Sequence, residues 1–142
     1  MTNSWKNYKE DTVLLIEAGF IAVNQADEDS ATKLFKAAST IDPKNTLAEV
    51  GMGYLYLHKL ELKQAVKIFE NILKIEPKNE MAKAFLGLCM GLQPNLADKG
   101  EKMLEQTAKS KDPLISSLSD MGIDFIEKFV KQTPGPAGRA HK

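Results

Sequence analysis

Apolar and polar positions follow the period of an α-helix in seven stretches of the chain, which short polar turns separate. The last stretch opens with Pro113, and proline is common at the first position of a helix. The pattern predicts an all-α fold. The expected helices cover about residues 10–25, 28–41, 46–58, 62–75, 80–92, 96–109 and 113–131.

The first six helices form three pairs, and the sequence pattern of one pair recurs in the next. Pro43 and Pro77 each lie within an Ile-acid-Pro-Lys-Asn segment. Small residues let the helices of a pair approach closely, and a phenylalanine fills the space between pairs. These positions recur at the interval of the two prolines: Gly19, Gly53 and Gly87; Ala31 and Ala65; Phe35 and Phe69. The interval is the period of tetratricopeptide repeats. We therefore expect an all-α tetratricopeptide-repeat superhelix of about three helix pairs plus a C-terminal capping helix.

The third repeat departs from this pattern. Lys99 occupies the small-residue position, Met103 the aromatic position, and the proline, Pro113, comes two residues late. End repeats often degenerate in this way, because they have no successor to pack against. The stretch that follows predicts a capping helix whose apolar residues largely share one face. These residues are Leu114, Ile115, Leu118, Met121, Ile123, Phe125, Ile126 and Phe129.

The repeat also sets the expected domain boundaries. We expect a single tetratricopeptide-repeat domain over residues 10–131, a flexible N-terminus over residues 1–9 and a disordered tail over residues 132–142. Trp5, in the N-terminal segment, either docks on a partner or covers its own domain.

Composition and charge exclude several classes of function. Nineteen basic residues balance 19 acidic ones, so no net positive field exists to hold nucleic acid or an anionic membrane. The first residues lack the apolar core of a signal peptide, and no apolar run is long enough to span a bilayer. Cys89 is the only cysteine, and its neighbours Leu88 and Met90 favour a packed, unreactive thiol. We expect a soluble protein of a reducing cytoplasm.

No constellation of residues points to catalysis or to a cofactor. His58 and His141 have no cysteine or carboxylate partners at metal-ligand spacing, and no phosphate-binding or nucleophile motif is present. The spacing of Gly87 and Gly91 indicates close helix packing. We expect no enzymatic activity, no metal and no cofactor.

Repeat numbering predicts an apolar concave groove, because the first helix of each repeat lines the inner side of such a stack. An amphipathic helix of another protein would cover this surface. The alternative is self-coverage, in which a terminal helix of the chain fills the groove or some of these residues belong to the core between repeats. The expected groove residues are Val13, Ile16, Phe20, Val23, Leu47, Val50, Tyr54, Leu57, Met81, Ala84, Leu88 and Leu92.

Residues 85–89 (Phe-Leu-Gly-Leu-Cys) and 108–113 (Ala-Lys-Ser-Lys-Asp-Pro), followed by Leu114-Ile115 and a final helix, carry a resemblance. With a weaker likeness at residues 17–22, they resemble the tetratricopeptide-like chaperones that hold the needle subunit of bacterial type III secretion systems. The first two repeats follow the general repeat consensus more closely than is usual in that family. Such regularity also suits the related chaperones of type III translocator proteins.

The resemblance implies a cytoplasmic chaperone that binds the amphipathic C-terminal helix of a needle subunit in its groove and prevents premature polymerisation. It also implies a small helical co-chaperone, with Leu14, Leu15 and Ala18 near its surface. The alternatives are a chaperone of translocator or effector proteins and a generic tetratricopeptide scaffold.

Overall fold

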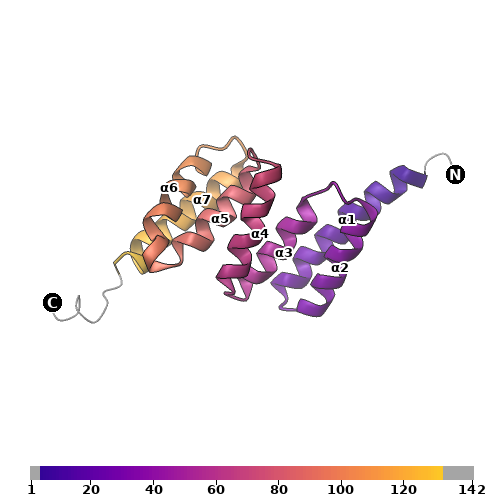
Figure 1. Cartoon of the computed structure of the whole chain (residues 1–142), viewed down its shortest axis with the longest axis horizontal. Helices are drawn as coiled ribbons and strands as arrows, with labels where there is room; N and C mark the ends of the chain where they lie inside the picture. Colours follow the sequence, from indigo (N-terminus) through magenta and orange to yellow (C-terminus); the bar gives the residue numbers. More distant parts are fainter. Residues whose placement is uncertain (1–3, 133–142) are drawn as a thin grey trace. The chain divides into compact units, whose positions relative to one another are not determined.

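The computed structural model describes residues 4–132, with side chains from residue 10 onward. In this range all seven predicted helices are present (Figure 1), so the predicted all-α fold of helix pairs and a capping helix is confirmed. The predicted tail, apart from Gln132, and the side chain of Trp5 lie outside the described range. The helices are α1 (Ser4–Asn24), α2 (Glu28–Ile41), α3 (Leu47–His58), α4 (Leu62–Ile75), α5 (Glu80–Gly91), α6 (Ala97–Thr107) and α7 (Pro113–Phe125).

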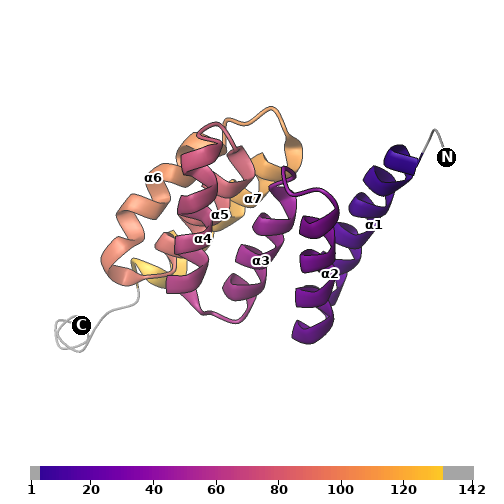
Figure 2. The same cartoon turned by 45° about the vertical axis from the view of Figure 1, so that its right-hand side comes forward.

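The chain consists of two compact units, residues 1–77 and residues 78–142. The N-terminal unit holds α1–α4, which form the two regular repeats as antiparallel pairs (Figure 2). The C-terminal unit holds α5–α7 with two short helices, η1 (Pro94–Leu96) and η2 (Ile126–Val130). Helix α1 begins at Ser4, so the first helix includes residues 4–9. The sequence-based boundary of the domain lies later, at residue 10.

Phe35 fills the space between the repeats of the N-terminal unit. A Cβ atom added at Gly19 of α1 would lie 2.5 Å from the Phe35 ring, and one added at Gly51 of α3 would meet the same ring. Gly53 has the same relation to Phe69 of α4, at 2.5 Å. Gly19 and Gly53 therefore let the second helix of each pair approach closely, as predicted. Their contact with the phenylalanine rings and the role of Gly51 were not predicted. The surrounding core consists of Ile16, Ala22, Val23, Ala31, Ala38, Ala48 and Leu55.

The turns within the first two repeats share an unusual backbone conformation. Ala26 and Leu60 occupy equivalent repeat positions, and each has a φ angle of 60°. In both turns the next residue donates a backbone hydrogen bond five residues back, Asp27 to Ala22 and Glu61 to Tyr56, as in a Schellman motif.

The same position in the third repeat is Pro94, and a proline ring holds φ at a negative value. A left-handed turn is therefore impossible there. The chain instead forms the 3-10 helix η1, and α6 begins one residue later than α2 and α4 do in their repeats. This shift corrects two predictions from the sequence. The small residue facing α5 is Gly100 in place of Lys99, and the buried position of Phe35 and Phe69 is taken by Leu104 in place of Met103.

Replacing Leu60 by glycine should stabilise the protein by about 0.5–1 kcal/mol. A left-handed residue with a side chain costs about 1–2 kcal/mol, which exceeds the entropy that glycine adds to the unfolded chain. Leu60 is 71% exposed, so little packing is lost. Urea unfolding followed by circular dichroism measures the gain. Leu60→Ala keeps the Cβ atom, and with it the strain of the left-handed backbone, so this variant should show no gain in stability. Equal gains for both variants would contradict this explanation.

The capping helix α7 has two different apolar faces, whereas the sequence predicted one. Its buried face consists of Ile115, Ser119, Gly122 and, at the start of η2, Ile126. The Ser119 hydroxyl shares a 2.6 Å hydrogen bond with Thr107 of α6. The second face remains in water, and we call it the C-terminal apolar stripe. It consists of Leu114, Met121, Phe125 and Phe129, which are 77%, 70%, 44% and 61% exposed.

Helix η2 is a π-helix, and its geometry ties the end of the described chain to α6. Lys131 donates its backbone N–H to Ile126, five residues earlier, at 2.9 Å. Its ammonium group lies 3.0 Å from Glu101 and 3.1 Å from Asp98, both on α6. These carboxylates, Glu101 first, raise the pKa of Lys131. Lys131 therefore links η2 to α6, the second helix of the third repeat, through two ion pairs.

Candidate functional site

The groove positions of the first two repeats lie side by side. Phe20 of α1 and Tyr54 of α3 hold the same place in their repeats, and their ring centroids are 5.5 Å apart. Phe20 also meets the Phe35 ring edge to face at 5.4 Å, and the Tyr54 hydroxyl donates a 2.7 Å hydrogen bond to Asn24. The core phenylalanine and this hydrogen bond fix both rings. They form a preorganised aromatic pair on the surface shared by α1 and α3.

Two exposed aliphatic residues extend this aromatic pair. Val13 is 51% exposed and Leu47 is 38% exposed, while Phe20 and Tyr54 are half-buried. We call these four residues the α1–α3 face. Their exposed side chains offer apolar contact area, and the Tyr54 hydroxyl and Asn24 amide add polar groups at one end. Such a surface suits an apolar segment of another protein.

Five of the predicted groove residues are buried, which corrects the sequence-based assignment. They belong to the packed interior and offer no surface to a guest, because almost none of their side-chain area reaches solvent. Their burial agrees with the alternative in which some of the expected groove residues belong to the core between repeats. The five residues are Ile16, Val23, Val50, Leu57 and Ala84.

The predicted groove residues of the third repeat lie in the C-terminal unit. Met81, Leu88 and Leu92 are half-buried. Met81 packs against the core cluster that contains Ile115 and Ile126, and Leu88 lies 3.4 Å from the position of a Cβ atom on Gly122 of α7. Helix α7 therefore partly covers α5, so self-coverage by the chain's last helix applies to this repeat.

The residues expected at the co-chaperone surface are brought together by the structure. Leu14, Leu15 and Ala18 line a shallow cavity of about 460 Å³ with Asp11 and Ile41, between α1 and the end of α2. Leu14 is 62% exposed. The cavity offers a largely apolar surface formed by α1 and α2.

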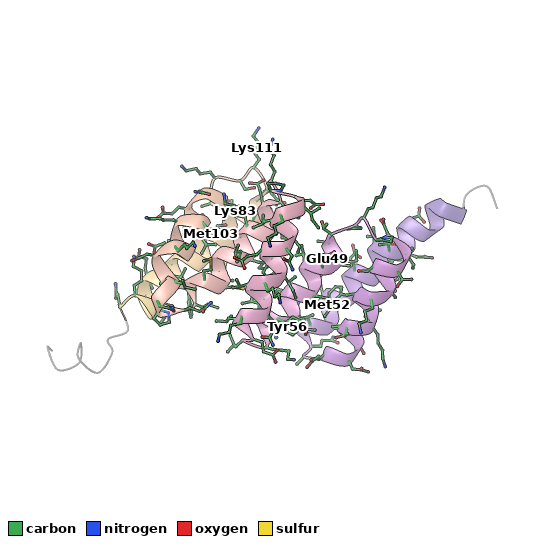
Figure 3. The ribbon with its side chains drawn as sticks, viewed as in Figure 1. Glu49, Met52, Tyr56, Lys83, Met103 and Lys111 are labelled. Atoms are coloured by element: carbon green, nitrogen blue, oxygen red, sulfur yellow. The ribbon has the colours of Figure 1, made fainter. Side chains whose placement is uncertain are left out.

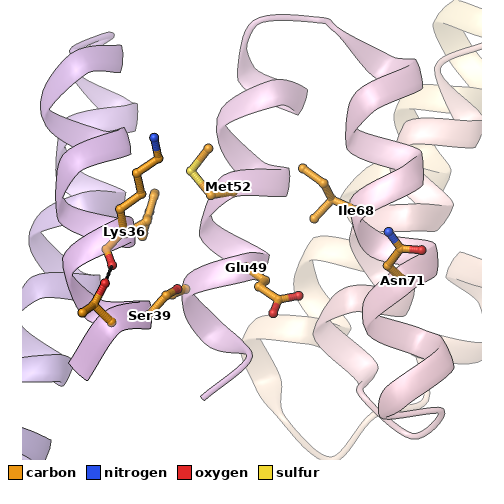
Figure 4. Close-up of a pocket in the computed structure, with 9 residues that line it drawn as sticks. Lys36, Ser39, Glu49, Met52, Ile68 and Asn71 are labelled. Atoms are coloured by element: carbon orange, nitrogen blue, oxygen red, sulfur yellow. Dashed lines mark hydrogen bonds between the residues drawn. The ribbon is translucent and has the colours of Figure 1, made fainter. Parts of the chain in front are cut away.

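A second cavity, which sequence reasoning missed, lies between α2, α3 and α4 and has a volume of about 500 Å³. Glu49 and Met52, which follow one another along α3 (Figure 3), form one part of its wall. Lys36 and Ser39 from α2 and Asn71 from α4 face it from either side (Figure 4). The spacing of Lys36, Ser39 and Thr40 along α2 was the available sequence signal, but it resembles any solvated helix face.

Cys89 and His58 lie in different surroundings. Cys89 is buried, as the sequence predicted, and burial raises the pKa of its thiol to about 12, so the thiol stays protonated at neutral pH. His58 is exposed and lies beside the Tyr54 ring, with centroids 6.0 Å apart. Between residues 4 and 132 no group of three or more histidine, cysteine or acidic residues could hold a metal ion. Among the described residues, the features that stand out are exposed apolar surfaces.

Comparison with known protein families agrees with this architecture. The family described as tetratricopeptide repeat matches residues 22–89, from the end of α1 to α5. Residues 22–89 therefore form tetratricopeptide repeats, and such repeats serve as scaffolds for protein–protein binding. No curated protein and no solved structure matches the chain. Among the described helices, none combines the length and apolar character needed to cross a membrane.

Proposed function

We propose that this protein acts as a chaperone that binds an apolar helical segment of another protein on the α1–α3 face, and that it does so without catalysis. The stacked Phe20–Tyr54 pair supports this most directly, because two rings held by Phe35 and Asn24 lose little freedom on binding. Exposed Val13 and Leu47 complete an apolar contact that a helix with anchors at i, i+3, i+4 and i+7 would cover.

The client we propose is the needle subunit of a bacterial type III secretion system, held in the cytoplasm before export. The resemblance of residues 85–89 and 108–113 to the chaperones of such subunits supports this choice. The cavity around Leu14, Leu15 and Ala18 is where a small helical co-chaperone would bind. A chaperone that buries the apolar face of a polymerising subunit competes with polymerisation by mass action and needs no energy source.

Replacing Val13 and Leu47 together by aspartate should abolish this complex. Each aspartate places a charge where an apolar contact is expected, and the double change should weaken binding by a factor of about 100 or more. Both side chains are exposed, so the fold should be kept. Co-expression with a candidate needle subunit, followed by affinity purification and size-exclusion chromatography, measures the loss.

The matched control is Ile75→Asp, which changes a 70% exposed isoleucine at the end of α4. This variant should bind the subunit as the unchanged protein does. A stable complex with the Val13→Asp/Leu47→Asp variant would refute the α1–α3 face as the binding site. Failure of the unchanged protein to bind any needle subunit would refute the proposed client.

A further inference from the structure

The C-terminal apolar stripe forms one continuous line along α7 and η2. Leu114, Met121 and Phe125 lie 7 and 4 residues apart, a spacing that keeps them on one side of an α-helix. An α-helical turn after Phe125 would rotate Phe129 partly toward the core, but a π turn takes in one more residue. Phe129 accordingly lies against Phe125, with ring centroids 5.0 Å apart. The stripe is therefore a surface separate from the buried face of the same helix.

Solenoid ends normally carry polar outer surfaces, since an apolar end invites association. On α7 the acidic residues lie elsewhere: Asp120 and Asp124 are exposed and lie on the side opposite the core. The surface of α7 therefore carries charged residues outside the apolar stripe. A limited apolar patch bordered by charged residues is typical of an interaction surface.

The order of residues in the stripe is nearly the same in both directions. Leu114 and Phe129 are equally distant from a point between Met121 and Gly122. Phe125 has the same relation to Leu118, a half-buried residue beside the stripe that also packs against the core. Two copies of the helix that run antiparallel about this point would place Leu114 against Phe129, Leu118 against Phe125 and Met121 near its counterpart. A two-fold interface requires such self-complementarity.

We infer that the C-terminal apolar stripe is the interface of a homodimer, in which the α7–η2 segments of two chains pair antiparallel across a two-fold axis at Met121. The formal net charge of the chain is zero, so no overall repulsion opposes the association of two copies. This surface lies in the C-terminal unit, whereas the proposed client site lies in the N-terminal unit, so each can be tested without the other.

The size of the stripe sets the strength of the dimer. Each of its four side chains leaves on the order of 100 Å² in water, or about 400 Å² per copy, against about 800 Å² per partner in a standard stable interface. Pairing is therefore weak and reversible, with dissociation in the micromolar range or above.

Sedimentation velocity of the full chain over a range from micromolar to millimolar concentration tests the inference. The mean mass should rise from that of the 15.7 kDa chain toward twice that value. Leu114→Glu/Met121→Glu should remain monomeric, because both side chains are at least 70% exposed and the change leaves the core intact. The control Ile75→Glu should dimerise as the unchanged chain does. A monomer at every concentration, or a dimer that persists in the double variant, would overturn the inference.

Cysteine cross-linking tests the antiparallel arrangement itself. Met121→Cys should oxidise to a covalent dimer, because the two-fold axis places this residue near its copy. Leu114→Cys alone should not form such a dimer, but a mixture of Leu114→Cys and Phe129→Cys chains should form the mixed product. The natural thiol, Cys89, is buried and does not interfere. Cross-linking of Leu114→Cys to itself with equal efficiency would show that the stripe is not paired antiparallel.

Discussion

Gly100→Ala is expected to destabilise the C-terminal unit by about 3 kcal/mol. The added methyl group would meet the backbone of α5 at Gly87 and Gly91, and a helix backbone cannot move aside as a flexible side chain can. Alanine in an ordinary helix interior would instead stabilise by up to about 1 kcal/mol relative to glycine. The expected sign is therefore opposite to that of helix propensity.

Hydrogen exchange measured by mass spectrometry can locate this effect. Protection should fall in α5 and α6, and the urea midpoint of the chain should fall with it. Lys99→Ala, one residue earlier on the same helix, changes an exposed side chain and serves as the control. If the sequence-based placement of the small residue at Lys99 were right, Gly100→Ala would leave protection unchanged.

Phe35→Ala is expected to cost about 3–5 kcal/mol and to unfold much of the N-terminal unit. The ring is only 1% exposed and lies where side chains on Gly19 and Gly51 would otherwise be. Its loss would leave a cavity between two helix pairs and remove the ring that supports Phe20. Thermal and urea unfolding followed by circular dichroism measures the cost.

A double-mutant cycle can test the relation between Phe35 and the glycine of the next repeat. Gly51→Ala alone should be destabilising because its methyl group meets the ring. In the Phe35→Ala background the same change fills part of the cavity, so the two costs should not add. Additive costs would mean that the ring and Gly51 do not share the space that the structure assigns to them.

Much of the fold was predictable because repeat proteins specify each element more than once. The prolines, glycines and phenylalanines at one period identified the helix pairs. The structure adds that Gly19 and Gly53 lie against the rings of Phe35 and Phe69. The third repeat was harder. Pro94 was visible in the sequence, but its effect depended on knowing that Ala26 and Leu60 adopt positive φ angles, which neither residue type indicates.

The candidate site was predicted only in part, because repeat numbering gives the direction of a side chain but not what lies over it. Phe20 and Tyr54 lie together as their shared position required. Ile16 and Val50 have the same apolar character, yet both are buried. The two faces of α7 were missed because a face of continuous apolar residues cannot be divided into core and surface until the neighbouring helices are placed.

The π turn at the end of α7 sets the direction of the side chains that follow it. If residues 126–130 wound as an ordinary α-helix with the sequence unchanged, the residues downstream would be rotated by about 100°. Phe129 would then turn partly toward the core, and Lys131 would turn away from Asp98 and Glu101. The direction of Phe129 and the ion pairs with α6 therefore depend on the same π turn.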